Sequence, residues 1–257
     1  MLTVDLNCDL GESFGHYKLG QDEQVLDLIT SANIACGYHA GDHNVMSNTV
    51  QLAVEKNVAI GAHPGFNDLF GFGRRNIDTS PRDIYNSVVY QVNALSGFCK
   101  IHRVNMQHVK PHGALFNIAS VKKEVAEAIA EAVYDTNPSL ILYGLSGSEL
   151  IVAGEKIGLN VANEVFADRT YQPNGTLTSR KDPNAMIKDV DEAIERVTQI
   201  VSKGETTAVD GTIIPLKADT VCIHGDEPSA LIFVQKLRLA LLDEGVILQS
   251  VGNTRKS

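Results

Sequence analysis

The chain has 257 residues, with 22 basic and 31 acidic side chains, so its formal net charge is −9. Hydrophobic residues at 44% and charged residues at 21% are ordinary values for a globular protein and exclude a disordered chain. The acidic balance argues against a nucleic-acid groove or an anionic membrane surface as the main partner.

No apolar run approaches the roughly 18 residues that a membrane span needs. The first residues, MLTVDLNCDLGE, lack the basic and apolar segments of a secretory signal. Cys8, Cys36, Cys99 and Cys222 show no paired spacing of the zinc or thioredoxin kind. We therefore expect a cytoplasmic protein whose cysteines are small buried residues, with a nucleophilic Cys8 as the alternative.

Short apolar segments alternate along the chain with longer segments of helical period. The segments that favour strands are Leu2–Leu6, Asn33–Cys36, Val58–Ala62, Asn105–Val109, Leu140–Tyr143, Asn160–Val165, Thr220–Ile223 and Val246–Gln249. Nearly all of their residues are apolar, which is typical of strands buried on both faces.

Three of the intervening helices have explicit start signals, which are Ser80-Pro81, Asp182-Pro183 and Pro228. The first helix has an apolar stripe that ends before Gly97, the second has its stripe over 187–201, and the third has its stripe over 230–241. Weaker stripes over 22–31, 44–57, 120–135 and 147–157 predict the remaining helices.

Strand–helix alternation repeated seven or eight times in 257 residues predicts a parallel β/α barrel. An open doubly wound sheet is the alternative. Two segments interrupt the alternation, a glycine-rich loop over Gly61–Thr79 and an expected β-hairpin over Thr206–Leu216. No linker or shift in composition divides the chain, so we expect one domain over residues 1–257.

Polar residues gather at the ends of the predicted strands. Five of the eight histidines lie at or just beyond a strand end, each with a glycine within two residues: His39, His43, His63, His112 and His224. Carboxylates accompany them at Asp9, Glu12, Asp42, Glu164 and Asp226. Because the carboxyl ends of barrel strands meet at one mouth, we expect these side chains to share a functional pocket.

The residue types leave two chemistries open. Asp9, His39 and His63 fit a two-histidine, one-carboxylate metal site that activates water. Without a metal, the same groups fit general acid–base catalysis. Lys110 and Arg74 are the natural clamps for a substrate anion, although Arg74-Arg75 also fits a solvated loop.

Several common enzyme classes become less favoured because their motifs are missing from the sequence. There is no phosphate-binding loop of the Gly-x-x-x-x-Gly-Lys-Ser/Thr type and no Gly-x-Gly-x-x-Gly between a strand and a helix. There is also no Gly-x-Ser-x-Gly nucleophile elbow. Dehydrogenases, P-loop ATPases and serine hydrolases are therefore disfavoured.

Six motifs, in order along almost the whole chain, resemble the family of 5-oxoprolinase A subunits, also called the LamB/YcsF family. They are DLNCDLGE (5–12), SANIACGYHAGD (31–42), GAHPGFNDLFGFGRR (61–75), VKPHGALFN (109–117), EVFADRTY (164–171) and VCIHGD (221–226). The resemblance implies a distorted seven-stranded β/α barrel of the glycoside hydrolase/deacetylase type.

The resemblance also implies a function. It implies hydrolysis of the cyclic amide 5-oxoproline (pyroglutamate) to L-glutamate, with ATP used by a complex that includes partner subunits B and C. An activated lactam still needs a base that delivers water and groups that stabilise developing charge. We assign Asp9 or Glu12 as base, His39, His63 and His112 as polarising or proton-shuttling groups, and Lys110 and Arg74 as clamps.

The other residues at matching positions are assigned to substrate binding: Asn7, Asp42, Glu164, Asp168, Arg169, His224 and Asp226. Two rival functions stay open. One is a metal-dependent deacetylase with its ion on Asp9, His39 and His63, and the other is a non-catalytic subunit that only binds oxoproline.

Overall fold

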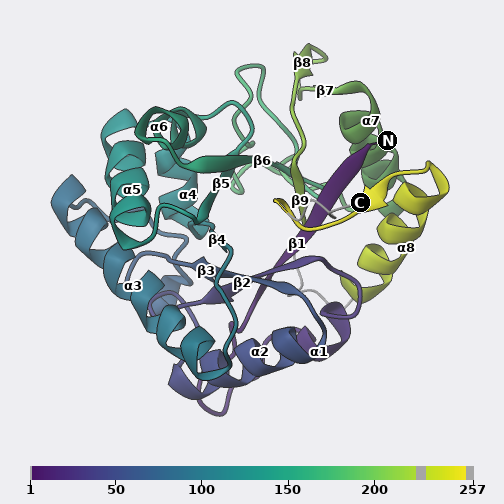
Figure 1. Cartoon of the computed structure of the whole chain (residues 1–257). Helices are drawn as coiled ribbons and strands as arrows, with labels where there is room; N and C mark the ends of the chain where they lie inside the picture. The colour runs from purple at the N-terminus through teal and green to yellow at the C-terminus, as the bar shows by residue number, and fades with distance from the viewer. Residues whose placement is uncertain (1, 224–229, 253–257) are drawn as a thin grey trace.

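Seven parallel strands form a closed barrel, and helices surround it in the computed structural model, which describes residues 2–223 and 230–252 (Figure 1). The strand order is β1-β2-β3-β4-β5-β6-β9, and β9 pairs back onto β1. This closure confirms the barrel and excludes the open doubly wound sheet. The barrel strands are β1 (Thr3–Leu10), β2 (Ser31–Ala35), β3 (Ala59–His63), β4 (His108–Val109), β5 (Ile141–Leu145), β6 (Asn160–Phe166) and β9 (Thr220–Ile223).

Three further strands lie outside this ring. A short strand, β10 (Ile247–Leu248), pairs in parallel with the start of β1. The antiparallel pair β7 (Glu205–Thr207) and β8 (Ile213–Pro215) confirms the hairpin predicted from the sequence. The described helices are α1 (Asp22–Val25), α2 (His43–Glu55), α3 (Pro81–Ile101), α4 (Gly113–Ala119), α5 (Lys123–Thr136), α6 (Glu149–Ile157), α7 (Val190–Lys203), α8 (Ala230–Asp243) and the 3₁₀ turn η1 (Leu69–Gly71).

Helix α3 begins as the sequence predicts, but it ends later. The hydroxyl of Ser80 accepts a hydrogen bond from the backbone N–H of Asp83, and Pro81 occupies the first turn. The expected stop at Gly97 is wrong, because the helix continues to Ile101 and its apolar face gains the buried Cys99.

Helix α7 begins later than the Asp182-Pro183 signal predicts. Its N-cap is Asp189, whose carboxylate accepts hydrogen bonds from the backbone N–H groups of Asp191 and Glu192. Asp182 instead caps a turn, since its Oδ1 accepts the N–H of Asn184 at 2.8 Å. The predicted start of the last helix at Pro228 lies outside the described residues.

Strand β1 differs most from its prediction. It continues to Leu10 and alternates polar and apolar side chains, whereas we expected a strand over Leu2–Leu6 that is mostly apolar and buried on both faces. Asp5 accepts hydrogen bonds from Ser31 of β2, Thr220 of β9 and Tyr143 on the far side of the barrel. The barrel interior is therefore polar, which explains why every second residue of β1 is polar.

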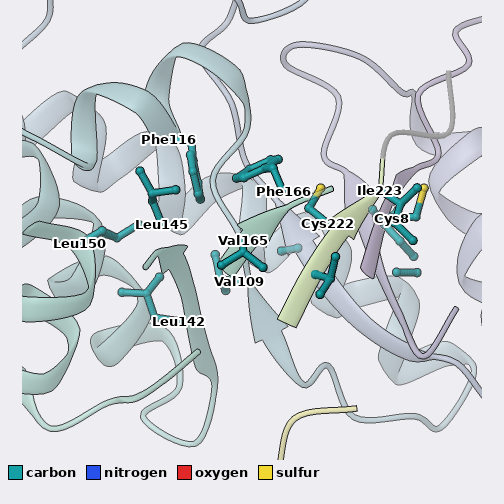
Figure 2. Close-up of a cluster of buried hydrophobic side chains, with 14 of the residues drawn as sticks. Cys8, Val109, Phe116, Leu142, Leu145, Leu150, Val165, Phe166, Cys222 and Ile223 are labelled. Carbon is teal, nitrogen blue, oxygen red and sulfur yellow. The ribbon is translucent and has the colours of Figure 1, made fainter. Parts of the chain in front are cut away.

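The apolar core lies mainly between the barrel wall and the helices. Figure 2 shows part of it, where Leu142 and Leu145 of β5, Leu150 of α6 and Phe116 of α4 come together. All four cysteines are buried and free, as expected. Cys8 joins this core, and burial raises its pKa well above the ordinary value, which argues against a nucleophilic role. Among the described residues, no helix combines the length and apolarity needed to span a membrane.

Candidate active site

A pocket of about 760 Å³ opens at the carboxyl ends of the barrel strands. Asp9, Glu12, His63 and His112 line it together with apolar residues, and its basic lining residues are Arg74, Arg75, Lys110, Arg169, Arg180 and Lys181. A volume of this size suits a small-molecule ligand. Among the described lining residues, cations outnumber carboxylates, which favours an anionic ligand.

Lys110 is the buried cation of the site. Its ammonium lies 3.0 Å from Oδ1 of Asp9 and 2.8 Å from Oε1 of Glu164, and its side chain is only 2% exposed. It also donates hydrogen bonds to Asn7 Oδ1 at 3.1 Å and to Cys222 Sγ at 3.0 Å. Burial alone would lower the pKa of Lys110, but the neighbouring carboxylates outweigh burial and raise that pKa well above its ordinary value.

Hydrogen bonds from polar residues inside the barrel hold the carboxylate of Asp9 in one orientation. Asn33 donates a hydrogen bond from Nδ2 to Oδ1 of Asp9 at 2.9 Å, and the Oδ1 of Asn33 lies 2.8 Å from Nε2 of His108. Burial lowers the pKa of His108 to about 3, so its ring is neutral and donates this bond. With Oδ1 occupied by Asn33 and Lys110, the Oδ2 of Asp9 lies 3.2 Å from Nε2 of His63.

Three histidines and Glu12 converge beside Asp9. Their ligand atoms all lie within 4.8 Å of one another, so the group Glu12, His39, His63 and His112 could hold a metal ion. Nδ1 of His112 is 2.9 Å from Nε2 of His63, and Nε2 of His39 is 3.3 Å from Oε1 of Glu12. The imidazoles of His39 and His112 stack in parallel at 3.7 Å. Burial lowers the pKa values of His39 and His112 well below the ordinary value.

Two glycines permit this packing. A Cβ on Gly65 would lie 2.7 Å from Nδ1 of His39, and a Cβ on Gly73 would lie 2.7 Å from Cβ of the same histidine. Gly73 also has a φ of +61°, which a side chain would disfavour. The loop after β3 therefore approaches the histidine cluster as closely as only glycine allows.

Most of the predicted site residues line the pocket or lie buried directly beneath it. Asp9, Glu12, His63, Arg74, Lys110, His112 and Arg169 line the pocket. His39 lies directly behind Glu12 and His112, while Asn7 and Glu164 are buried beneath the pocket as partners of Lys110.

Asp42, His43 and Asp168 are not among the pocket-lining residues. Asp42 caps α2, and its Oδ2 accepts the backbone N–H of Gly15 at 2.7 Å. His43 is exposed as the first residue of α2. His224 and Asp226 lie outside the described residues.

Sequence reasoning missed several members of the site. It treated Asn33 and His108 only as parts of strands, and it did not single out Arg180 or Lys181. The polar alternation Asp5-x-Asn7-x-Asp9 was the available signal, because a period of two predicts one polar face in a strand. It would have indicated a polar barrel interior that needs further polar partners.

Comparison with known proteins identifies close relatives over the whole chain. The profile of the LamB/YcsF family matches residues 4–256. The chain is 64% identical to the A subunit of 5-oxoprolinase from Halalkalibacterium halodurans over 98% of both chains, and 55% identical to the A subunit of 5-oxoprolinase from Bacillus subtilis over the full length of both.

A solved structure agrees with these relatives. The crystal structure of a lactam utilization protein from Thermus thermophilus superposes with a TM-score of 0.91 at 42% identity, covering 97% of this chain and all of that one. The motifs, the barrel and the strand-end pocket thus have one explanation: the chain belongs to the LamB/YcsF family.

Proposed function

We propose that this protein opens the lactam ring of 5-oxoproline to give L-glutamate, as the A subunit of an ATP-using 5-oxoprolinase with partner subunits B and C. The observation that carries the proposal is a pocket that combines an oriented carboxylate, Asp9, with a cationic rim. The names of the relatives from Halalkalibacterium halodurans and Bacillus subtilis supply the substrate.

Asp9 is the proposed general base. Lys110 and Asn33 bind its Oδ1 and so orient the carboxylate, and we assign to Asp9 the role of taking a proton from water at the lactam carbonyl carbon. The imidazoles of His63 and His112 line the same pocket, and we assign them to proton shuttling.

Arg74 is the proposed clamp for the substrate carboxylate. Its guanidinium lies 4.9 Å from the centre of the Phe72 ring, at the rim of the pocket. Lys110 is less suited to the clamp role that its residue type suggests, because an ammonium has three hydrogens and Lys110 already has four polar neighbours within the protein. We therefore assign Lys110 to orienting Asp9.

Activation by ATP is assigned to the partner subunits. The sequence contains no nucleotide-binding motif of the P-loop or dinucleotide type. An unactivated lactam is a poor electrophile, so the complete reaction depends on the partners to activate its carbonyl carbon. After water adds to that carbon, the ring opens when the C–N bond breaks and the nitrogen takes up a proton. The buried, free cysteines fit a reducing compartment, and we place the complex in the cytoplasm.

The proposal is tested by measuring glutamate release from 5-oxoproline with the purified chain, with and without ATP and the partner subunits. We expect glutamate only from the complete mixture. Asp9→Asn should reduce turnover by about a hundredfold or more, the usual scale for a positioned base. Asp27→Asn, at an exposed ion pair with Lys56, is the matched control and should retain full turnover.

Full turnover by Asp9→Asn with intact complex formation would instead support a subunit that only binds oxoproline. Absence of glutamate from the complete wild-type mixture would refute the proposed reaction altogether.

A further inference from the structure

A chain of hydrogen bonds runs through the barrel interior from Lys110 to Asp5. The ammonium of Lys110 donates to Oδ1 of Asn7 at 3.1 Å, and Nδ2 of Asn7 donates to the hydroxyl of Thr220 at 2.6 Å. The Thr220 hydroxyl in turn donates to Oδ2 of Asp5 at 2.6 Å. All four residues are at most 2% exposed, so bulk water does not compete for these bonds.

The hydrogen bonds of this chain can point in only one direction. An ammonium has hydrogens but no lone pair, so the atom of Asn7 that faces Lys110 must be the amide oxygen. The amide nitrogen of Asn7 then faces Thr220, whose hydroxyl accepts from it and has its own hydrogen left for Asp5. The carboxylate of Asp5 is therefore the last acceptor of a chain that starts at a cation.

Asp5 suits this position because hydroxyl groups surround its carboxylate. Its Oδ1 accepts hydrogen bonds from Thr30 and Ser31, and its Oδ2 accepts one from Tyr143 as well as the one from Thr220. Burial raises the pKa of Asp5, and these four hydrogen bonds oppose that rise. Four donors satisfy an ionised carboxylate where water is absent, so Asp5 can hold the far end of the chain fixed.

We propose that Thr220 and Asp5 are positioning residues, which hold the amide of Asn7 with its oxygen toward Lys110. The inference rests on the proposed function, in which Lys110 orients the carboxylate of Asp9. Thr220 is the first residue of β9 and Asp5 lies in β1, and neither is among the residues that line the pocket. Both therefore act through Lys110 and do not touch the substrate.

The Thr220 hydroxyl decides how the amide of Asn7 is held. Without it, the amide nitrogen would keep only the carboxylate of Glu164, whose pKa is raised by burial and lowered in part by Lys110 and by a hydrogen bond from Asn7. Turning the amide over would place its hydrogens against the ammonium of Lys110 and against Nδ2 of Asn33, which lies 2.7 Å from Oδ1 of Asn7. Neither arrangement satisfies both ends of the amide, so we expect Lys110 to shift when the hydroxyl is removed.

The test compares Thr220→Val, which removes the hydroxyl but keeps the shape, with Thr220→Ser, which keeps the hydroxyl. In the complete glutamate assay, Thr220→Val should lower kcat about tenfold and change the KM for 5-oxoproline by less than about twofold, because the pocket lining is intact. Thr220→Ser should restore kcat. Thr206→Val is the matched control, since Thr206 is also buried in a strand but its hydroxyl has no partner among the described residues.

A second measurement needs neither 5-oxoproline nor the partner subunits. Lys110 is the one buried lysine among the described residues, so its ammonium hydrogens should exchange slowly enough to give a separate ¹⁵N–¹H signal. Thr220→Val should shift this signal and speed its hydrogen exchange, whereas Thr220→Ser and Thr206→Val should keep the exchange rate of the wild type. In the wild type, the amide hydrogens of Asn7 should show a stronger nuclear Overhauser contact with Thr220 than with the Lys110 ammonium.

Three results would overturn the inference. They are full kcat with an unchanged ammonium signal in Thr220→Val, an equal loss of kcat in Thr220→Ser, and a stronger contact of the Asn7 amide hydrogens with Lys110 than with Thr220. The last of these is read from the wild type, so it decides the direction of the chain even where a variant does not fold. Absence of glutamate from the wild-type complex would refute the ring opening, while the ammonium signal would still test the chain of hydrogen bonds.

Discussion

Lys110 sits between two carboxylates that have almost no access to water. The side chains of Lys110, Asp9 and Glu164 are 2%, 11% and 0% exposed. Burial raises the pKa of Glu164, and the ammonium of Lys110 offsets part of that effect. Removing the cation would leave two buried carboxylates to repel each other, so the orientation of Asp9 and the stability of the barrel depend on the same side chain.

We predict that Lys110→Met lowers the free energy of unfolding by about 3–5 kcal/mol, the usual cost of breaking a buried ion pair from one side. Lys156→Met is the matched control, because Lys156 pairs with Glu127 on the surface and should change stability by less than about 1 kcal/mol. Urea unfolding followed by circular dichroism measures both variants. Equal effects of the two substitutions would contradict the role assigned to Lys110.

At the scale of single elements, Asp42 joins helix α2 to the loop after β1. Its Oδ1 accepts the N–H groups of Asn44 and Val45, and its Oδ2 accepts the N–H of Gly15. These hydrogen bonds, of which that from Val45 has the largest effect, lower the pKa of Asp42 below its ordinary value of 3.8. The carboxylate therefore stabilises the fold while it is ionised.

Asp42→Ala should lower the free energy of unfolding by about 0.5–2 kcal/mol at neutral pH. Because the pKa is lowered in the folded state, this contribution is complete above the ordinary pKa of 3.8 and disappears as the pH falls through the folded value. Urea titrations of wild type and variant should therefore converge as the pH falls below 3.8. Asp78→Ala, in an exposed loop, is the control, and a gap between wild type and Asp42→Ala that does not change with pH would refute the capping role.

Strand β3 contains a glycine that makes room for a ring inside the barrel. A Cβ on Gly61 would collide with the imidazole of His108, whereas a Cβ on Gly97 in α3 would meet no atom within 4 Å. We predict that Gly61→Ala destabilises the protein by about 1–3 kcal/mol or more through overpacking. Gly97→Ala should stabilise it by about 0.5–1 kcal/mol through helix propensity. Denaturation midpoints that shift in the same direction for both variants would refute this comparison.

The elements also show what the sequence could and could not predict. The barrel and the presence of Asp9, Glu12, His63 and His112 in the pocket follow from strand–helix alternation and from polar residues at strand ends, which are local patterns. The predicted start of α7 was wrong because Asp182 and Asp189 are equally good local caps. Long-range contacts decided between them, since the N–H of Ile187 bonds to the carbonyl oxygen of Asp168 and so cannot join the helix.

The partners of Lys110 were beyond prediction for a related reason. Asn7 and Cys222 lie 103 and 112 positions away along the chain. Closure of the barrel brings them together, and no pattern within one segment records which side chains meet across its interior. The sequence therefore indicated Lys110 as a site residue, but it did not indicate that Lys110 forms ion pairs with Asp9 and Glu164.

For the whole molecule, β1 is the strand on which the sheet depends most. It pairs with β2, with β9 and with β10, so residues from both halves of the chain meet on it. We predict that residues 1–257 unfold in one cooperative transition, with coincident urea curves from far-ultraviolet circular dichroism and tyrosine fluorescence. Two separated transitions would show that the chain comprises more than one folding unit.

The pairing of Thr3 with Ile247 has a further consequence for how this chain can be built. Since β1 and β10, the first and last strands, lie side by side, a linker could join the two ends of the chain and turn the polypeptide into a ring (Figure 1). The ring could then be reopened between the exposed Asp210 and Gly211, at the tip of a hairpin that lies outside both the barrel wall and the pocket. Such a circular permutant would keep every strand neighbour, and it would begin at β8 and end at β7.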